Sequence, residues 1–409
     1  MKASFALAFA LGASIVGFRL IMADAQSMTS LPIIGRVDEK AIATAVPEPR
    51  IQAYDLSPDG NTLAMYVVSG DQVHAPSWLV IADVKTSKIL RHVEFGLSPS
   101  YIVGYAPQVA FTPDGKLLVV QDEQTVRVLE SENLRNVRKI DPPAGSRFKV
   151  PARIQAASSS NTFAITFGDG KPLQNYKDGQ SVHTEMIDAA NGTHTGSWDS
   201  DHIPLSLSPD AKLVVVPDRL TKSVVIGVEI LDTKSGKKIT TLNGWEVLGT
   251  HVSLGIFGTR LLGKFVNDDE LLLTSDGNAD KSGRDLGAIL RDVRISDGKV
   301  LQEIAPVKYG PTGEMAVSAD QKDWIALSRY SNPADLKHPW AIPHYPPPEL
   351  MVFSGLPEFR LVARVQVSTL LGLRMYHLFE NSGLRISADG SVIAIAENNG
   401  VTVMQNPKH

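Results

Sequence analysis

The sequence of 409 residues contains no cysteine. This absence excludes disulfides, thiolate nucleophiles, iron–sulfur clusters, cysteine-ligated zinc and covalently attached c-type haem. It also excludes a lipid anchor on an N-terminal cysteine. The chain has no run of five like charges, and its formal net charge is −4. We therefore expect no nucleic-acid partner, because such a partner requires a basic face.

Several catalytic and cofactor motifs are missing as well. The sequence has no HExxH zinc motif and no G-x-S-x-G nucleophile elbow, and its ten histidines are scattered. The segment 258–264, "GTRLLGK", resembles part of a phosphate-binding loop, but Phe265 stands where Ser or Thr is required, and no helix is predicted after it. The sequence therefore assigns no catalytic residue, and the cofactor stays unknown.

The N-terminus has the pattern of an export signal. Lys2 precedes the apolar stretch 3–18, Arg19 ends it, and 23–25, "ADA", fits signal peptidase cleavage before Gln26. The alternative is an uncleaved anchor, but Arg19 interrupts the run before the roughly 20 apolar residues that a bilayer requires. We expect residues 1–25 to be a signal peptide and the mature protein to be periplasmic or secreted, without a membrane span.

What the sequence has in abundance is one repeated phrase. It reads "SPDG" at 57–60, "TPDG" at 112–115, "SPDA" at 208–211 and "SADG" at 387–390. Apolar runs flank each copy, and Pro, Asp and Gly suit successive positions of a tight turn. Weaker copies fill the gaps, and a second hairpin pattern with a polar turn follows each copy except the last. Each unit therefore predicts four antiparallel strands.

Repeats of this kind predict an all-β fold, a seven-bladed β-propeller with four antiparallel strands per blade. The seventh unit has only three strands before the chain stops. The segment 33–46 precedes the first hairpin and has no partner in its own unit. We expect it to supply the missing outer strand of the last blade. The predicted organisation is a signal peptide (1–25), an N-terminal segment with the closing strand (26–50) and the propeller (51–409).

The turn phrases after "AYDL", "VAFT" and "LRIS", together with "VIADVKTSK" and "EILDTKSGK", resemble the exported WD40-like and YVTN/TolB-like β-propellers. The resemblance covers about 51–406. It implies a propeller fold. Its members include binding scaffolds, quinoprotein dehydrogenase subunits and lactonases, so it implies no single activity.

Loop lengths suggest which face carries a site. The turns within hairpins are tight, whereas the connections on the opposite rim are long, as at 69–78, 168–181, 275–287 and 331–348. Long loops that gather on one rim favour a binding face there. The predicted ligand or partner residues on this long-loop face are His74, Trp78, Tyr176, His338, Trp340, His344 and Tyr345.

Each candidate has a structural alternative. The rings of 331–348 could pack on a neighbouring blade, and Trp78 could begin a strand and bury its ring. Asp276, Asn278 and Asp280 have the spacing of calcium-loop ligands, but Lys281 and Gly287 depart from the pattern, so a polar hairpin loop is the alternative.

Two functions remain open from the sequence. The first is an exported binding or scaffold module that holds a protein or small molecule on its long-loop face. The second is a propeller enzyme or enzyme subunit, lactonase-like or quinoprotein dehydrogenase-like, with its site at the mouth of the central channel.

Overall fold

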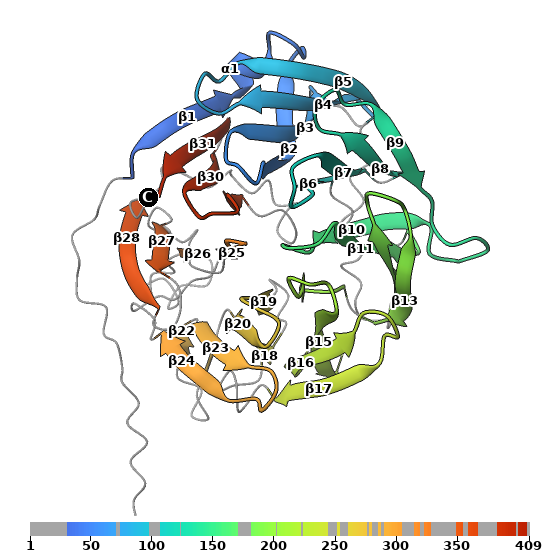
Figure 1. Cartoon of the computed structure of the whole chain (residues 1–409), viewed down its shortest axis with the longest axis vertical. Helices are drawn as coiled ribbons and strands as arrows, with labels where there is room; N and C mark the ends of the chain where they lie inside the picture. The colour runs from blue at the N-terminus through green and yellow to red at the C-terminus, as the bar shows by residue number, and fades with distance from the viewer. Residues whose placement is uncertain are drawn as a thin grey trace, which may run out of the picture.

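The computed structural model describes residues 31–406, with gaps at 71–73, 98–106, 123, 171–180, 202, 222–223, 244–251, 254–260, 276–277, 280–284, 288–289, 305–314, 320–322, 329–348, 355–358, 367–382 and 398–399. The described chain forms antiparallel sheets that radiate from a central channel, as Figure 1 shows. This arrangement is a β-propeller, as the repeats predicted.

The sheets follow one another along the chain. The first comprises β2 (Pro49–Leu56), β3 (Thr62–Ser69), β4 (Pro76–Asp83) and β5 (Ile89–Leu97). The second comprises β6 (Gln108–Phe111), β7 (Leu117–Gln121), β8 (Val126–Glu130) and β9 (Asn136–Ile140). The third comprises β10 (Val150–Ala156), β11 (Thr162–Gly168), β12 (Val182–Asp188) and β13 (His194–Ser200).

The next sheets repeat this order from the channel outward. The fourth comprises β14 (Ser206–Leu207), β15 (Leu213–Thr221), β16 (Val224–Asp232) and β17 (Lys238–Asn243), with β18 (Val252–Ser253) beside β16. The fifth comprises β19 (Leu261–Phe265), β20 (Glu270–Ser275), β23 (Leu290–Arg294) and β24 (Val300–Ile304). The sixth comprises β25 (Met315–Val317), β26 (Asp323–Ser328), β27 (Glu349–Ser354) and β28 (Arg360–Gln366).

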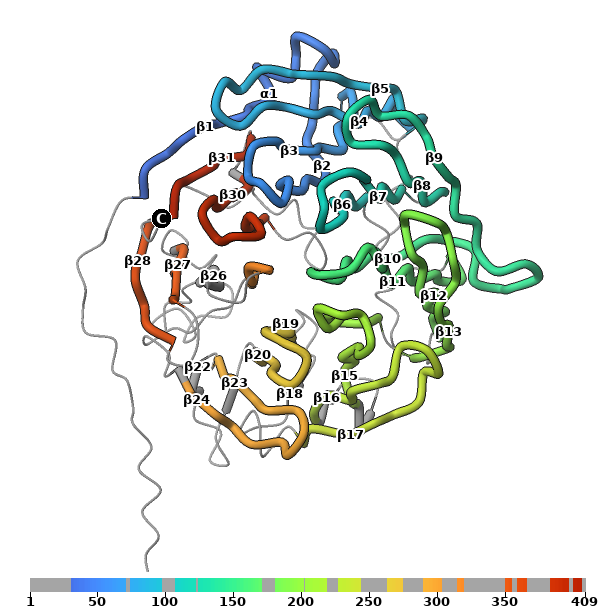
Figure 2. The backbone as a smooth tube through the Cα atoms, viewed as in Figure 1, coloured from blue at the N-terminus to red at the C-terminus, as the bar shows by residue number. Residues whose placement is uncertain are grey.

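The last sheet joins the two ends of the ring. It comprises β29 (Leu384–Ile386), β30 (Val392–Glu397), β31 (Gly400–Gln405) and β1 (Ile33–Asp38). Strand β1 pairs antiparallel with β31, with Val37 opposite Val401. The predicted closing strand is therefore confirmed, and Figure 2 shows β1 and β31 side by side. The segment 33–46 is not strand throughout, because Asp38 caps the short helix α1 (Glu39–Ile42) by accepting from the Ala41 amide at 2.8 Å.

The number of strands departs from the prediction in the fourth sheet. Among the described residues there are six four-stranded blades, not the seven that were predicted, because the fourth sheet has five strands. Strand β16 extends beyond its pairing with β17, which involves Gly227 to Leu231. Its first residues, Val224 and Val225, are left with an open edge, and β18 from the following connection pairs with them. A two-residue strand inside a long connection has no sequence pattern that predicts it.

The hydrophobic core lies between neighbouring sheets. Strand β3 shows why: Leu63, Met65 and Val67 are buried against the last sheet, whereas the alternate residues Ala64 and Tyr66 are buried against the second. A strand that is covered on both faces requires a continuous apolar run. The run 62–69 supplies one, and similar buried clusters join the other neighbouring sheets.

The repeated phrase forms the same turn in each sheet where it occurs. The hydroxyl of Ser57 donates to Asp59 at 2.6 Å and accepts from the amide of Thr62 at 2.9 Å. Thr112, Ser208 and Ser387 make the equivalent pair of bonds. Gly60, at φ 71°, takes the left-handed conformation that glycine adopts without strain. The phrase thus specifies the first hairpin of a blade.

Within the described ranges, no helix has the length and apolar character that crossing a membrane would require.

Candidate functional site

A cavity of about 300 Å³ lies in the central channel. It is lined by the carboxyl ends of the innermost strands β2, β6, β10, β14, β19, β25 and β29 and by the turns that follow them. It therefore lies at the end of the channel that carries the tight turns. Its volume is within the range of small-molecule sites.

Each innermost strand contributes its penultimate residue to the wall of this cavity, together with some of its neighbours. The penultimate residue stands directly before the last strand residue and the turn. We call these residues the inner ring: Asp55, Ala110, Gln155, Ser206, Lys264, Ala316 and Arg385. The sheets are arranged alike around the channel, so these equivalent residues come together at the cavity. Arg153, two residues before Gln155, also lines the cavity.

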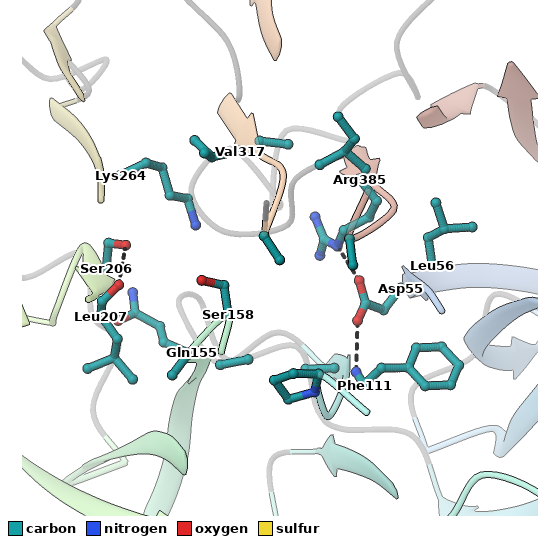
Figure 3. Close-up of a pocket in the computed structure, with 18 of the residues that line it drawn as sticks. Asp55, Leu56, Phe111, Gln155, Ser158, Ser206, Leu207, Lys264, Val317 and Arg385 are labelled. Carbon is teal, nitrogen blue, oxygen red and sulfur yellow. Dashed lines mark hydrogen bonds and ion pairs between the residues drawn. The ribbon is translucent and has the colours of Figure 1, made fainter. Parts of the chain in front are cut away.

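The charged residues that line the cavity are mostly cationic. Arg153, Lys264 and Arg385 are the cations, and Asp55 is the one carboxylate among the described lining residues. Figure 3 shows the Lys264 amine and the Arg385 guanidinium both directed into the cavity. Among the described lining residues, three cationic side chains therefore accompany one carboxylate.

Asp55 and Arg385 form an ion pair across the seam between the first and last sheets. Arg385 Nε lies 2.9 Å from Asp55 Oδ1, and the Phe111 amide donates to Asp55 Oδ2 at 2.8 Å. Burial raises the pKa of the Asp55 carboxyl, while Arg385 and the Phe111 amide oppose that rise. Arg385 therefore favours the charged form of this carboxyl, and burial opposes it. Figure 3 shows both bonds.

Further bonds hold Arg385 in place. Its Nη1 donates to the Leu384 carbonyl at 2.9 Å, and its guanidinium carbon lies 5.6 Å from the centre of the Tyr54 ring. The Tyr54 hydroxyl in turn donates to the Gly383 carbonyl at 2.7 Å. These contacts fix the guanidinium at the edge of the cavity, which lowers the entropy cost of binding a ligand there.

Amide side chains connect the inner strands on the other side of the channel. Gln108 Oε1 accepts from the Ile154 amide at 2.6 Å, and Gln155 Nε2 donates to the Pro204 carbonyl at 2.5 Å. These bonds join the second sheet to the third and the third to the fourth. The Ser158 hydroxyl, on the turn after β10, points into the cavity (Figure 3).

Arg153 owes its direction to an irregularity in β10. The register between β10 and β11 shifts between Pro151 and Arg153, and such a bulge re-aims side chains. Arg153 is half-buried. Its backbone pairs with that of Thr166, and its side chain makes no hydrogen bond or ion pair with another residue that the structure describes.

The predicted residues of the long-loop face lie elsewhere or outside the described residues. His74 is exposed, with φ at 62°. Trp78 is in β4, half-buried, and it packs beside the cluster between the first and last sheets, with its ring 5.7 Å from that of His92. Neither lines the cavity. Tyr176, His338, Trp340, His344 and Tyr345 lie outside the described residues.

The possible calcium loop is described only in part. Asn278 is in β21 (Asn278–Ala279), which pairs with β22 (Asp285–Gly287) as a small hairpin. Asp276 and Asp280 lie outside the described residues. Within the described part of the chain, no group of three or more His, Asp or Glu side chains could hold a metal ion.

Sequence reasoning missed the inner ring. A signal was present, because each charged member precedes the last strand residue and its turn, as Asp55 does in "YDLSPDG" and Arg385 in "LRISADG". Lys264 was set aside together with the incomplete phosphate loop, yet it lines the cavity. Finding the ring requires the knowledge that residues so far apart in sequence converge on one channel.

No protein-family model matches the sequence. No curated protein matches it either. Among solved structures, the fold is similar to a chain of Kuenenia stuttgartiensis hydrazine synthase, with a TM-score of 0.53 and 18% identity over 89% of this chain and 97% of that chain.

Two further solved structures are similar to the chain. A chain of the mitotic checkpoint complex has a TM-score of 0.52 and 12% identity over 99% of both chains. The Myceliophteria thermophila Cps50 (Swd1) β-propeller domain has a TM-score of 0.50 and 11% identity over 92% of this chain and 100% of that domain. At these identities the likeness shows the fold alone, so the chain is a β-propeller to which no family is assigned.

Proposed function

We propose that this protein is a ligand-binding module and that its ligand site is the central cavity. The cavity carries the proposal: it has a volume of about 300 Å³, and each innermost strand contributes to its wall. A site built on rigid strands holds its polar groups in fixed positions, which favours binding of a defined small molecule. β-Propellers commonly serve as binding modules, and the function argued here comes from the site rather than from the fold.

Blocking the cavity tests this proposal. Ser158 is exposed on a turn and its side chain enters the cavity, so Ser158→Trp places an indole there without disturbing a strand. The matched control is Ser197→Trp, at an exposed position of the outermost strand β13. Purified protein is screened by thermal shift against a library of metabolites. We expect stabilising compounds that lose their effect in Ser158→Trp and keep it in Ser197→Trp.

Compounds that stabilise both variants equally would place binding outside the cavity and reject the proposal. A screen in which no compound stabilises the parent protein would reject it too. The same experiment addresses the enzyme alternative, because a bound compound can be recovered and weighed. Recovery of an altered compound, with loss of conversion in Ser158→Trp, would make the cavity an active site.

The long-loop face is proposed as a second contact surface, for a protein partner. The argument is the gathering of long connections on one rim, with the aromatic and histidine side chains of 331–348 among them. Deletion of 333–346 tests it by crosslinking in cell envelope extract. Loss of one crosslinked partner with metabolite binding retained supports the surface, whereas an unchanged set of crosslinked partners removes the case for it.

Export is also proposed, from the signal pattern at 1–25. The intact mass of the protein recovered from the periplasm or medium tests this. We expect a chain that begins at Gln26. A full-length mass together with cytoplasmic recovery would reject export.

A further inference from the structure

Several titratable side chains form a row on β12 and β13, the two outer strands of the third sheet (Figure 2). His183 in β12 lies opposite Asp199 in β13, and Glu185 is two residues further along β12, on the same face. His194 in β13 completes the row. We call these residues the histidine cluster: His183, Glu185, His194 and Asp199. None of them lines the central cavity.

His183 is held between two carboxylates. Its Nδ1 lies 2.6 Å from Asp199 Oδ1, and its Nε2 lies 2.7 Å from Glu185 Oε1. An ionised carboxylate only accepts hydrogen bonds, and a neutral imidazole has a single N–H to donate. Both contacts are therefore hydrogen bonds only when the imidazole is protonated and carries a positive charge.

The imidazole and Glu185 are held in place, whereas Asp199 is exposed. The His183 ring stacks on the Phe148 ring, with centroids 6.2 Å apart and planes at 14°, and Phe148 is buried between the second and third sheets. The Glu185 side chain is 10% exposed, and its other oxygen lies 3.1 Å from His194 Nδ1. The Asp199 side chain is 66% exposed, so it can turn to water at little cost.

The elements that pack against this face carry basic residues. They are Arg138 in β9, and Arg147 and Lys149 on the connection from β9 to β10. Arg138 lies beside Gly192, in the turn between β12 and β13, and the guanidinium carbon of Arg147 lies 4.7 Å from the centre of the Phe148 ring. Among the described residues, none of these basic side chains bonds to the histidine cluster. His183 is therefore the cation that bridges the two carboxylates.

Protonation of His183 decides whether both bonds can exist. Burial lowers the pKa of the imidazole, but the bonds to Asp199 and Glu185 outweigh burial and raise that pKa above its ordinary value of 6.5. After loss of the proton, one nitrogen lone pair faces a negatively charged oxygen, and the two repel each other. The exposed Asp199 is the partner that can move away. The neutral imidazole then keeps its proton on Nε2, toward Glu185.

From this arrangement we propose that Asp199, His183 and Glu185 form a pH-sensitive latch at the outer edge of the third sheet, closed by protonation of His183 and opened by release of Asp199. Release removes one tie between β13 and β12 and leaves a carboxylate that the imidazolium had neutralised. The latch goes beyond the proposed ligand site and does not depend on the central cavity.

An NMR titration of the full chain labelled with ¹⁵N-histidine tests the latch. The signals of His183 are identified by their absence in His183→Gln. We expect a titration midpoint above 6.5. Once neutral, the ring should carry its proton on Nε2 and have a bare Nδ1. Nitrogen chemical shifts distinguish this tautomer from the one that is protonated at Nδ1.

Asp199→Asn separates a latch from a histidine that is merely packed. The variant keeps an acceptor oxygen at this position but removes the negative charge, so the midpoint of His183 should fall. The matched control is Asp201→Asn, the same substitution at an exposed residue two positions later. The carboxylate of Asp201 accepts from the Ser181 hydroxyl at 3.3 Å and makes no bond to His183. This control should leave the midpoint of His183 where the parent has it.

Urea unfolding gives a second measure. Because the pKa of His183 is higher in the folded state, the stability from its proton is fully present below about pH 6.5 and is lost as the pH rises through the folded-state value. Asp199→Asn should therefore be destabilised, relative to the parent, more at about pH 5.5 than at about pH 9. The effect of Asp201→Asn should be the same at both pH values.

Three results would overturn the latch: a His183 midpoint at or below 6.5, equal midpoints in Asp199→Asn and the parent, or a destabilisation by Asp199→Asn that does not change with pH. A neutral ring that carries its proton on Nδ1 would overturn the release of Asp199. None of these results bears on the proposed ligand site, because Ser158→Trp tests the cavity separately.

Discussion

Arg385 Nε lies 2.9 Å from Asp55 Oδ1, across the seam at which the last sheet of the ring meets the first. The two residues are 330 positions apart in sequence. Both are inner-ring residues, so one ion pair serves the closure of the ring and the shape of the cavity. This double role makes the pair the most informative place for mutation.

Arg385→Ala should destabilise the fold by about 3 kcal/mol. The substitution leaves the Asp55 carboxylate largely buried without its cation, and that penalty dominates when a buried pair loses one partner. Urea unfolding measures the effect. The double variant Asp55→Ala/Arg385→Ala should recover part of the loss, because the unpaired charge is gone. A double variant that is no more stable than Arg385→Ala would show that the pair is energetically unimportant.

Removal of β1 should open the ring. Deletion of residues 1–38 exposes the edge of β31 and removes Val37, which is fully buried between the last sheet and the first. Burying one such side chain contributes about 1.5–3 kcal/mol, and the lost strand pairing adds to it. Deletion of 1–30 is the control, because it keeps β1. Melting curves should fall by many degrees for the first deletion only; coincident curves would contradict closure by β1.

Two glycines in equivalent turns should respond differently to alanine. Gly60 and Gly115 have φ near 70°, so each Gly→Ala change should cost about 1 kcal/mol in backbone strain. A Cβ on Gly60 would also lie 2.8 Å from Val392 Cγ2 in the last sheet, whereas one on Gly115 meets nothing closer than 3.5 Å. Gly60→Ala should therefore be the more harmful by about 1–3 kcal/mol in urea unfolding. Equal effects would mean that the two sheets adjust freely at this seam.

Asp292 should make stability depend on pH. It lies in β23 and is buried, and burial, with Glu270 nearby, raises its pKa to about 7. The folded state therefore holds this proton more tightly than the unfolded state, whose carboxyl titrates near 3.8. The stability that this proton contributes is fully present below about pH 4, and it is lost as the pH rises to about 7. Above that pH, this group no longer changes the free energy of unfolding.

Asp292→Asn removes that dependence. Relative to the parent, the variant should be equally stable near pH 4 and more stable at pH 8, by about 4 kcal/mol at most. Comparing the two proteins at each pH cancels the contribution of other groups. A difference that does not change between pH 4 and pH 8 would show that the native carboxyl titrates normally.

Much of the fold was predictable because the sheets are local. The turn phrase at 57–60 lies between two apolar runs, and the pairing of Leu56 with Leu63 follows from it directly. The closing strand was predictable from an unpaired segment at each end of the repeats. The fifth strand of the fourth sheet was not, because Val252 and Ser253 are too short a segment to show alternation.

The site was harder to predict than the fold. Asp55 and Lys264 have no motif in common, and only the ring geometry brings their strands to one channel. Trp78 attracted notice as an aromatic residue beside a long loop, but it packs between two sheets. A large aromatic side chain can be buried between two sheets as readily as it can contact a ligand. Residue type alone therefore could not separate a packing role from a binding role.

The pairing of β1 with β31 also sets an order of events during biosynthesis. A ribosome releases β1 hundreds of residues before β31 exists, so the first strand has no neighbour for most of translation. Final assembly must wait until the whole ring has been synthesised. Such a delay makes the closing seam the last part of the protein to mature.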